Sequence, residues 1–351
     1  MAFVSVPLGG ASRADLRGFA RCRAGYGGVV VAPGRLPLSV RQCARSDRVD
    51  IAGASAVAAQ TTETHGLAPS VLGLPEIKVV ASDVDGTLLT TGHTLPDDVS
   101  RTIVEMMDAG IAFFPATGKS RIGALNSFCE PLKSRLGVTS PGVYLQGLVV
   151  YKEGGELLYE RALEPGVVAK VAQKARDLDC AWVAYSGDRI LCEPMSARNQ
   201  NLVDSLTEYH EPQAETDAEL VEKIMGGSYS INKALLIADE QFIDTHRPAF
   251  RELLVGEATL TQAQADMLEI LPLGASKGDG VRRLLDHLGF SFSELMAIGD
   301  AENDLEMLKF AGIGCAVGNA LPSVKAAADF EVRSNNEGGV SEAIRRFVLK
   351  Q

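Results

Sequence analysis

From residue 77 onward, short runs of apolar residues alternate with longer stretches in which apolar positions recur every three to four residues. The short runs predict buried β-strands, and the longer stretches predict amphipathic helices. Strands are expected at residues 77–81, 111–116, 295–298 and 312–317, and helices at 95–108, 120–136, 277–288, 303–310, near Val324 and at 340–349. This alternation indicates an α/β fold, a doubly wound parallel sheet with helices on both faces.

A long segment between residues 142 and 275 interrupts this alternation. It carries two hairpin signals, at residues 149–159 and 181–192, each with a Gly-containing turn between apolar runs. A helix is expected at 167–178, then a strand at 233–237, a helix at 241–254 and strands at 258–261 and 267–270. We therefore expect residues 74–141 and 276–351 to form one core domain, and residues 142–275 to form an inserted α/β domain.

Two carboxylates follow the first predicted strand. Asp83 and Asp85 flank Val84 and precede Gly86. Side chains two residues apart in an extended segment point the same way, and Gly86 lets the chain turn tightly behind them. Two converging acids repel unless a cation or a proton separates them, so the pair indicates Mg²⁺ and a carboxylate nucleophile. Taken alone, the motif also fits a solvated strand-to-helix loop. An EF-hand calcium loop is disfavoured because its later ligands and closing Glu are absent.

Two further polar clusters point to phosphate. Thr117 and Gly118 end the strand at 111–116, where a hydroxyl and the free N–H groups of a helix start can bind phosphate. Lys277 begins the helix at 277–288, where a positive charge opposes the helix dipole and a bound anion would explain it. Each feature has an ordinary structural alternative, a helix N-cap for the threonine and a solvated surface residue for the lysine.

The last cluster, Asp300, Asn303 and Asp304, follows the strand at 295–298. Asp300 and Asp304 are four residues apart, so they can share one helix face or flank its first turn. Aspartate near a helix start is ordinary capping chemistry. A second strand-end acid pair in one chain is less ordinary, and it favours a site where the carboxyl ends of the strands meet.

Taken together, these clusters resemble the motifs of the haloacid dehalogenase (HAD) superfamily of phosphotransferases, specifically its Cof-type phosphatases. They occur in the family order: residues 83–87, Thr117, Lys277 and residues 299–304. Residues 316–320 also resemble this subfamily, and the similarity extends over most of the chain after residue 75. The resemblance implies a Rossmann-like HAD core with an inserted α/β cap domain, and phosphomonoester hydrolysis through an aspartyl-phosphate.

The resemblance also implies a role for each motif residue. Asp83 would attack phosphorus, and Asp85 would protonate the leaving alkoxide and then deprotonate the attacking water. Thr117, Gly118 and Lys277 would bind the phosphate. Mg²⁺ would be bound by Asp83, by Asp300 and by the backbone carbonyl of Asp85. Asn303 and Asp304 would support these groups. This division agrees with phosphoryl transfer, in which positioning and charge neutralisation carry most of the catalysis.

The sequence departs from the subfamily at three positions. Val84 stands where Leu is common, Lys119 where Arg is frequent, and Gln146 where Asn is common. Both Val and Leu are apolar, so the first change matters little. Arg binds phosphate through a bidentate fork and Lys does not, so Lys119 would alter substrate preference if it touches the substrate.

The insertion carries no motif that identifies its substrate-contacting residues. The hairpin tip near residue 187 offers four candidates, Tyr185, Ser186, Asp188 and Arg189. Such tips are also polar for solubility alone. Trp182 is more typical of a core residue than of a stacking platform for a sugar.

Charge is unevenly distributed along the chain. Residues 1–50 hold eight Arg, no Lys and three acidic residues, which gives a formal charge of +5. Since the whole chain has a net charge of −11, residues 51–351 carry −16. An Arg- and Ala-rich head with few acids is typical of an organelle transit peptide, here assigned to residues 1–73. A plastid is preferred over a mitochondrion or the cytoplasm, and a plain disordered tail is the alternative.

Composition limits the other function classes. The acidic body argues against nucleic acid as a partner. No apolar run reaches the ~18 residues of a membrane-spanning helix, so no membrane partner is expected. The six Cys and five His show no spacing typical of a metal or redox site.

These observations predict a Mg²⁺-dependent phosphatase that acts on a small phosphorylated metabolite, with sugar phosphates as the first expectation. The alternatives are a nucleotide or flavin-precursor phosphatase and a phosphomutase. A non-catalytic binding protein is disfavoured because both acids of the first motif, Asp83 and Asp85, are intact. The oligomeric state is not predicted.

Overall fold

The computed structural model describes residues 73–262 and 264–351. These residues belong to one compact unit, Leu67–Gln351. The predicted transit segment, residues 1–73, lies outside the described residues apart from Gly73, and therefore stays a prediction.

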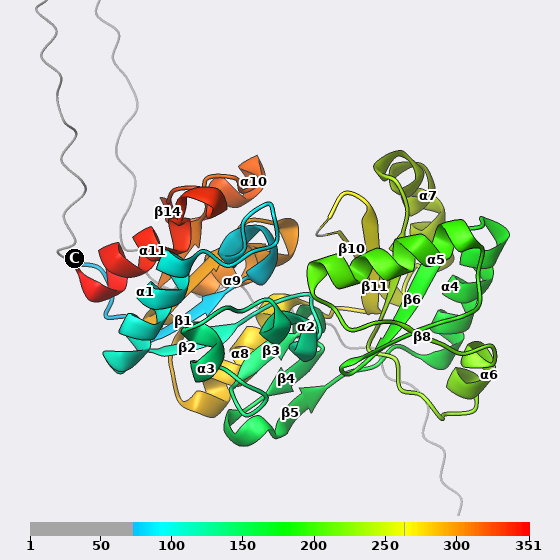
Figure 1. The fold of residues 1–351 in the computed structure, drawn as a ribbon, viewed down its shortest axis with the longest axis horizontal. Coiled ribbons are helices and arrows are strands. Elements are labelled where there is room, and N and C mark those ends of the chain that lie inside the picture. The colour runs from blue at the N-terminus through cyan, green and yellow to red at the C-terminus, as the bar shows by residue number, and fades with distance from the viewer. Residues whose placement is uncertain (1–72, 263) are drawn as a thin grey trace, which may run out of the picture. The chain divides into compact units, whose positions relative to one another are not determined.

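A five-stranded parallel sheet forms the centre of the core (Figure 1). Its order is β14-β13-β12-β1-β2, so β1 lies between β12 and β2. The strands are β1 (Val79–Ser82), β2 (Ala112–Pro115), β12 (Leu295–Gly299), β13 (Ile313–Ala316) and β14 (Phe330–Glu331). β1, β12 and β13 are buried along their whole length, as expected for apolar strands covered on both faces. The predicted α/β class with a doubly wound sheet is confirmed.

The core helices form two packed groups. α1 (Asp97–Asp108) contacts α11 (Gly339–Ala343) and the following helical turn Ile344–Leu349, whereas α8 (Lys277–Leu288) contacts α9 (Leu305–Phe310). A short helix, α10 (Pro322–Lys325), contacts β13. None of the helices within residues 73–262 and 264–351 combines the length and apolar character needed to cross a membrane.

One predicted core helix is wrong. In place of a single helix over residues 120–136, the chain forms α2 (Arg121–Asn126) and α3 (Leu132–Arg135). Pro131 lies between them, and proline has no N–H to donate to a helical hydrogen bond. The helix at residues 277–288 is observed as predicted, because the Ser276 hydroxyl accepts the Asp279 N–H at its start and Gly289 adopts φ 77° at its end.

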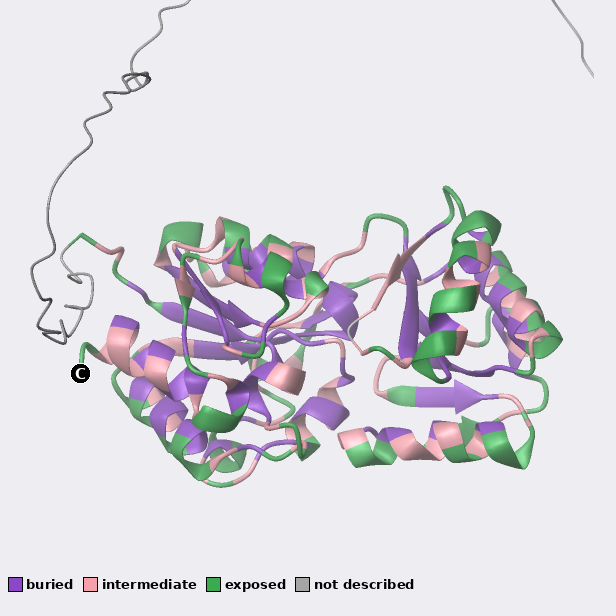
Figure 2. Ribbon diagram, turned by 90° about the horizontal axis from the view of Figure 1, so that it is seen from above, coloured by how far each residue is buried: buried purple, intermediate pink, exposed green. Residues whose placement is uncertain are grey.

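The insertion contains a six-stranded sheet in the order β10-β11-β9-β6-β7-β8. The strands are β6 (Ala181–Ser186), β7 (Arg189–Cys192), β8 (Glu215–Thr216), β9 (Lys233–Ile237), β10 (Ala258–Thr261) and β11 (Met267–Pro272). Its helices are α4 (Pro165–Asp177), α5 (Ala197–Asp204), α6 (Leu220–Met225) and α7 (Glu240–Leu253). Figure 2 shows the strands of both sheets largely in the colour of buried residues.

Alternation along these strands gives the inserted sheet two different faces. Trp182 and Leu236 lie on the face that packs against α4 and α7. Tyr185 and Leu235 lie on the opposite face, in a cluster with Met267 and with residues of the segment 144–149. Trp182 is therefore a core residue, as the sequence favours, and the opposite face is the one available to a site.

A third sheet of three antiparallel strands joins the two parts. It consists of β3 (Gly142–Tyr144), β4 (Val149–Tyr151) and β5 (Leu157–Glu160). β3 contacts β2, and all three strands contact α8. Because this sheet packs on the core, its contacts favour a start of the insertion after β5. The predicted start, at residue 142, is earlier than that.

Candidate active site

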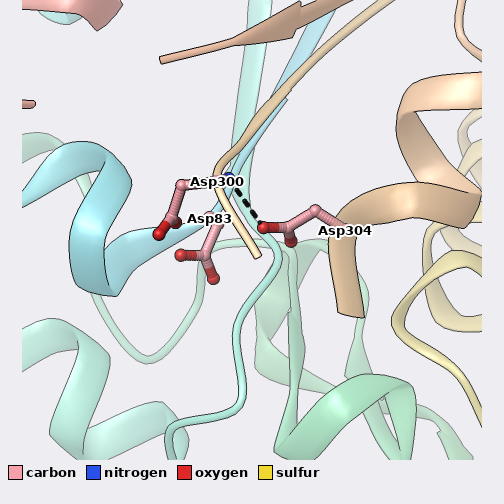
Figure 3. A group of neighbouring side chains, drawn as sticks. All are labelled: Asp83, Asp300 and Asp304. Atoms are coloured by element: carbon pink, nitrogen blue, oxygen red, sulfur yellow. Dashed lines mark hydrogen bonds between the residues drawn. The ribbon is translucent and has the colours of Figure 1, made fainter. Parts of the chain in front are cut away.

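Three motif segments meet at the carboxyl edge of the parallel sheet. Asp83 follows β1, Thr117 follows β2 and Asp300 follows β12. Because β1 pairs in parallel with both neighbours, these strand ends lie at the same edge. Figure 3 shows Asp83, Asp300 and Asp304 together there, and one carboxylate oxygen of each lies within 4.8 Å of the others.

Lys277 connects two of these carboxylates. Its Nζ donates to Asp83 Oδ1 at 2.5 Å and to Asp304 Oδ1 at 2.7 Å. The ammonium group is fully buried, and it reaches the site from the first turn of α8. Burial alone would lower the pKa of Lys277, but Asp304 and Asp83 raise it overall, so the side chain stays charged. The alternative of a solvated surface lysine is therefore wrong.

Asp304 has both oxygens engaged by the protein. Besides Lys277, it accepts the backbone N–H groups of Asp300 at 2.9 Å and Ala301 at 3.0 Å. A Cβ at Gly299 would come within 2.5 Å of the Asp304 Cβ, so only glycine fits at this strand end. Asp304 thus fixes the loop after β12 and holds Lys277.

Asp300 is held from the first motif. The Thr87 hydroxyl donates to Asp300 Oδ1 at 2.7 Å. Gly86 adopts φ 78°, and a Cβ there would lie 2.6 Å from Asp300 Oδ2. The tight turn predicted at Gly86 is present, and it makes room for this carboxylate.

The carboxylates outnumber the positive charge that faces them. Burial raises the pKa of Asp83 well above its usual range, and the nearby charges of Asp304 and Asp300 add to the rise while Lys277 opposes it. Burial, followed by the charge of Asp304, raises the pKa of Asp300 to about 7. Neighbouring buried oxygen donors with excess negative charge are a suitable donor set for a divalent cation such as Mg²⁺. Asp83 and Asp300 are the members of this cluster with oxygens left to bind one.

Asp85 faces a different partner. Its Oδ2 lies 3.0 Å from the Nζ of Lys119, while its Oδ1 is buried without a partner among the described residues. The observed carboxylate cluster consists of Asp83, Asp300 and Asp304, whereas the predicted metal ligands are Asp83, Asp85 and Asp300. The expected contribution of Asp85 is a backbone carbonyl, so the predicted metal set of Asp83, Asp85 and Asp300 stays a prediction.

Thr117 and Gly118 lie beside Gln146. Thr117 is buried, and its hydroxyl accepts the backbone N–H of Lys119 at 3.2 Å. A Cβ at Gly118 would lie 2.5 Å from Gln146 Nε2. Asn303 donates to Gln146 Oε1 at 3.0 Å, so the second and fourth motifs are linked through the residue that departs from the subfamily pattern.

A cavity opens above these residues, between the strand ends and the inserted sheet. The predicted residues that line it are Asp83, Asp85, Thr117, Gly118, Lys119, Gln146, Tyr185 and Asn303. The insertion adds residues that sequence reasoning missed, above all Lys233 and Glu269. A signal for Glu269 exists in the sequence, since it is a charged residue inside the apolar run 267–272.

The hairpin-tip candidates separate into two groups. Tyr185 lines the cavity. Asp188 pairs with Arg121 at 2.8 Å, and Arg189 pairs with Glu215 at 2.7 Å, and neither lines the cavity, nor does Ser186.

The profile of the haloacid dehalogenase-like hydrolases matches residues 80–344 of the sequence. The chain belongs to this family. A solved haloacid dehalogenase-like hydrolase from Bacteroides thetaiotaomicron is 27% identical, with a TM-score of 0.67 over 77% of this chain and 99% of that one. The predicted core-plus-cap architecture is thereby confirmed.

Two relatives of the chain differ in the activity that their names give. An HMP-PP phosphatase of Citrobacter koseri is 28% identical over 260 residues, 70% of this chain and 86% of its own length. The Arabidopsis thaliana protein named "Endoribonuclease YBEY, chloroplastic" is 37% identical over 281 residues, 78% of this chain. The match spans only 47% of that longer relative, so the name describes a larger protein. The assignment of this chain to the phosphatases of the family is confirmed.

Proposed function

We propose that this protein is a Mg²⁺-dependent phosphomonoester hydrolase that acts through an aspartyl-phosphate on Asp83. The observation that carries the proposal is the contact of Lys277 Nζ with Asp83 at 2.5 Å, beside Thr117 at the shared strand edge. A phosphate monoester dianion repels a carboxylate nucleophile, and a buried ammonium group at the nucleophile offsets that repulsion.

Phosphate binding falls to Thr117, Gly118 and Lys277. The lysine supplies a compact positive charge, and the threonine hydroxyl can donate to a phosphoryl oxygen. Asp304 acts on the lysine, because its carboxylate holds Nζ at 2.7 Å and fixes its direction.

Asp83, the backbone carbonyl of Asp85, and Asp300 would hold Mg²⁺. When bound, the ion supplies the second positive charge that neutralises the phosphoryl oxygens. The raised pKa values of Asp83 and Asp300 support a cation here, since burial and mutual repulsion disfavour two bare carboxylates.

Asp83 attacks phosphorus as the bond to the ester oxygen breaks, and Asp85 donates its proton to that oxygen. Asp85 then takes a proton from water, whose oxygen attacks the phosphoryl group and releases Asp83. Oδ1 of Asp85 has no hydrogen-bond partner within residues 73–262 and 264–351, which supports this assignment because one oxygen of the carboxylate is left for substrate or water.

The substrate is a small phosphorylated metabolite. The sequence places sugar phosphates first and nucleotide or flavin-precursor phosphates second, and the likeness to an HMP-PP phosphatase supports a small organic phosphate. The Arg-rich first 50 residues and the chloroplastic relative together support a plastid location. Fusion of residues 1–73 to a fluorescent protein tests that location, and a cytoplasmic signal would contradict it.

Trapping of the covalent intermediate tests the mechanism. Asp85→Asn removes both the acid of the first step and the base of the second, so the test needs an ester whose leaving group requires no protonation, such as 4-nitrophenyl phosphate. Rapid quenching of this variant with that ester and Mg²⁺ should reveal a protein heavier by one phosphoryl group at Asp83. EDTA should abolish both this adduct and phosphate release by the unaltered protein. An adduct on another residue, or isomerised product without free phosphate, would contradict the proposed reaction.

A further inference from the structure

The leaving group of the proposed reaction would lie in the part of the cavity that the insertion lines. That part contains charged side chains, which can bind hydroxyl or anionic groups, and apolar side chains, which can bind the face of a ring. The substrate class therefore depends on which of these two sets is free.

The charged set is engaged by the loop that follows Thr117. Each of the four residues 118–121 bonds to a different residue of the insertion. The pairs, core residue first, are Gly118 with Lys233, Lys119 with Tyr209, Ser120 with Glu211, and Arg121 with Asp188. The insertion thus uses its polar groups to hold the phosphate-binding loop.

Lys233 and Glu269 form a buried ion pair that is tied to the core on both sides. Lys233 Nζ donates to the Gly118 carbonyl at 2.7 Å and to Glu269 Oε1 at 2.5 Å. The other Glu269 oxygen accepts Gln146 Nε2 at 2.5 Å. The side chains of the ion pair are only 4% and 6% exposed. A substrate that drew either partner away would leave a buried charge unpaired, which is strongly unfavourable.

Glu211 and Lys119 are occupied in the same way. Glu211 accepts the Ser120 N–H at 3.0 Å and the Ser120 hydroxyl at 2.5 Å, one at each oxygen. Lys119 contacts both Asp85 and the Tyr209 carbonyl. Lone pairs of these carboxylates and a third ammonium hydrogen of each lysine are left over, but a sugar hydroxyl that used them would share a charge already engaged in charge-assisted hydrogen bonds.

The apolar side chains make no hydrogen bond to the phosphate-binding loop, although the backbone carbonyl of Tyr209 accepts from Lys119 and Lys233 Nζ lies 4.5 Å from the centre of the Tyr185 ring. The apolar set consists of Leu206, Leu235 and Met267 with the rings of Tyr185 and Tyr209, and the uncharged amide of Gln264 lines the same cavity. In addition, the described residues that line the cavity include four carboxylates, Asp83, Asp85, Glu211 and Glu269, but only two lysines, Lys119 and Lys233. This balance disfavours a leaving group that carries a further negative charge.

From these contacts we infer that the preferred substrates are phosphate monoesters whose leaving group is an uncharged, apolar ring rather than a polyhydroxy sugar. The ring lies against the apolar side chains of the insertion, while Lys233 and Glu211 stay bound to the loop 118–121 and Glu269 stays bound to Lys233 and Gln146. This inference rests on the proposed function, and it departs from the sequence-based expectation that sugar phosphates come first.

Three esters of matched geometry test it: benzyl phosphate, 4-carboxybenzyl phosphate and glucose 6-phosphate. In each, a six-membered ring is carried on a CH₂–O–phosphate group, so the chemistry of the leaving oxygen is similar. With the full chain and Mg²⁺, kcat/KM for benzyl phosphate should exceed that for glucose 6-phosphate by about tenfold or more. The carboxylated ester should be turned over less well than benzyl phosphate.

Met267→Gln tests whether the apolar side chains of the cavity cause the preference for the benzyl ester. The change keeps the side-chain volume and adds a polar amide. We expect the benzyl-to-glucose ratio of kcat/KM to fall by about tenfold. Met225→Gln makes the same change at a position that is 56% exposed on α6, and should keep the wild-type ratio.

Equal or better turnover of glucose 6-phosphate by the wild type would overturn the inference and leave the proposed function intact. Turnover of the carboxylated ester at or above that of benzyl phosphate would also overturn it, as would an unchanged ratio in a folded Met267→Gln protein. Failure to release phosphate from all three esters would reject the proposed function itself, and the inference with it. The wild-type comparison decides the matter even if the Met267 variant does not fold.

Discussion

Lys277 in the core and Lys233 in the insertion are both buried lysines that lie 2.5 Å from a carboxylate oxygen. Lys277 reaches its partners from a helix start, and those partners, Asp83 and Asp304, follow two neighbouring parallel strands. Lys233 pairs with Glu269 within one face of an antiparallel sheet. Its second contact is a backbone carbonyl, that of Gly118.

The difference shows how one type of ion pair can serve two purposes. Lys277 contacts the proposed nucleophile directly, so its charge acts on the reacting group. Lys233 acts through the position of Gly118, next to Thr117, so it is a positioning residue.

The largest effect is expected from Asp83→Asn. Loss of the proposed nucleophile should lower kcat by roughly 10⁴-fold or more, because no other group can form the covalent intermediate. The thermal midpoint should not fall, since the change removes one of three clustered carboxylates. Asp97→Asn, an exposed acid on α1, is the matched control and should keep wild-type activity. Retained turnover in Asp83→Asn would remove the nucleophile assignment.

Replacing each buried lysine by methionine separates the two roles. Both changes leave a buried carboxylate without its cation, so each should lower the free energy of unfolding by about 3–5 kcal/mol. Lys277→Met should also lower kcat by about 10²–10³-fold. Lys233→Met should lower kcat by only about tenfold, through displacement of the loop.

The control for this pair is Lys309→Met, at an exposed position on α9, which should affect neither quantity. Urea unfolding and phosphate release measure the two effects. Equal losses of kcat in the two buried variants would end the distinction between a reacting-site lysine and a positioning lysine.

Removal of Mg²⁺ should affect the core cluster and leave the insertion unchanged. Mg²⁺ should raise the thermal midpoint of the wild type, because a ligand that binds only the folded state stabilises it, and Asp300→Asn should weaken this shift. The Lys233→Met protein should keep it. An equal Mg²⁺ shift in Asp300→Asn would exclude Asp300 from the metal site.

The same cluster predicts a dependence on pH in EDTA. The pKa of Asp300 rises from 3.8 to about 7 on folding, so the folded state holds a proton that the unfolded state releases. Relative to Asp300→Asn, the wild type should lose stability as the pH rises from about 4 to about 7. A constant difference across that range would contradict the raised pKa.

The smallest effect is expected from deletion of residues 1–70. All of the proposed catalytic, phosphate-binding and metal-binding residues lie between Asp83 and Asp304, so kcat/KM in solution should not change. A folded but inactive product would show that the N-terminal segment contributes to activity.

The core half of the site was predictable because its signals are local. Asp83, Thr117 and Asp300 each follow an apolar run, and Ser276 and Gly289 delimit the helix that carries Lys277. The carboxyl ends of parallel strands lie at one edge of the sheet. Once these runs are recognised as parallel strands, the residues that follow them are therefore predicted to lie close together.

The insertion half was not predictable in the same way. Lys233 and Glu269 are 36 positions apart, and their pairing depends on the strand order β11-β9-β6. The bond of Glu211 to Ser120 depends on how the insertion packs on the core, and no local pattern encodes that packing. Sequence reasoning therefore selected hairpin-tip residues, of which only Tyr185 lines the cavity.

The four bonds of residues 118–121 have a consequence for protein engineering. This loop belongs to the core by sequence, yet its polar partners lie in the insertion. A chimaera that exchanged only the segment after β5 and before α8 would keep a loop matched to the discarded insertion. Residues 118–121 must therefore be transferred with the insertion if the phosphate site of the hybrid is to keep its geometry.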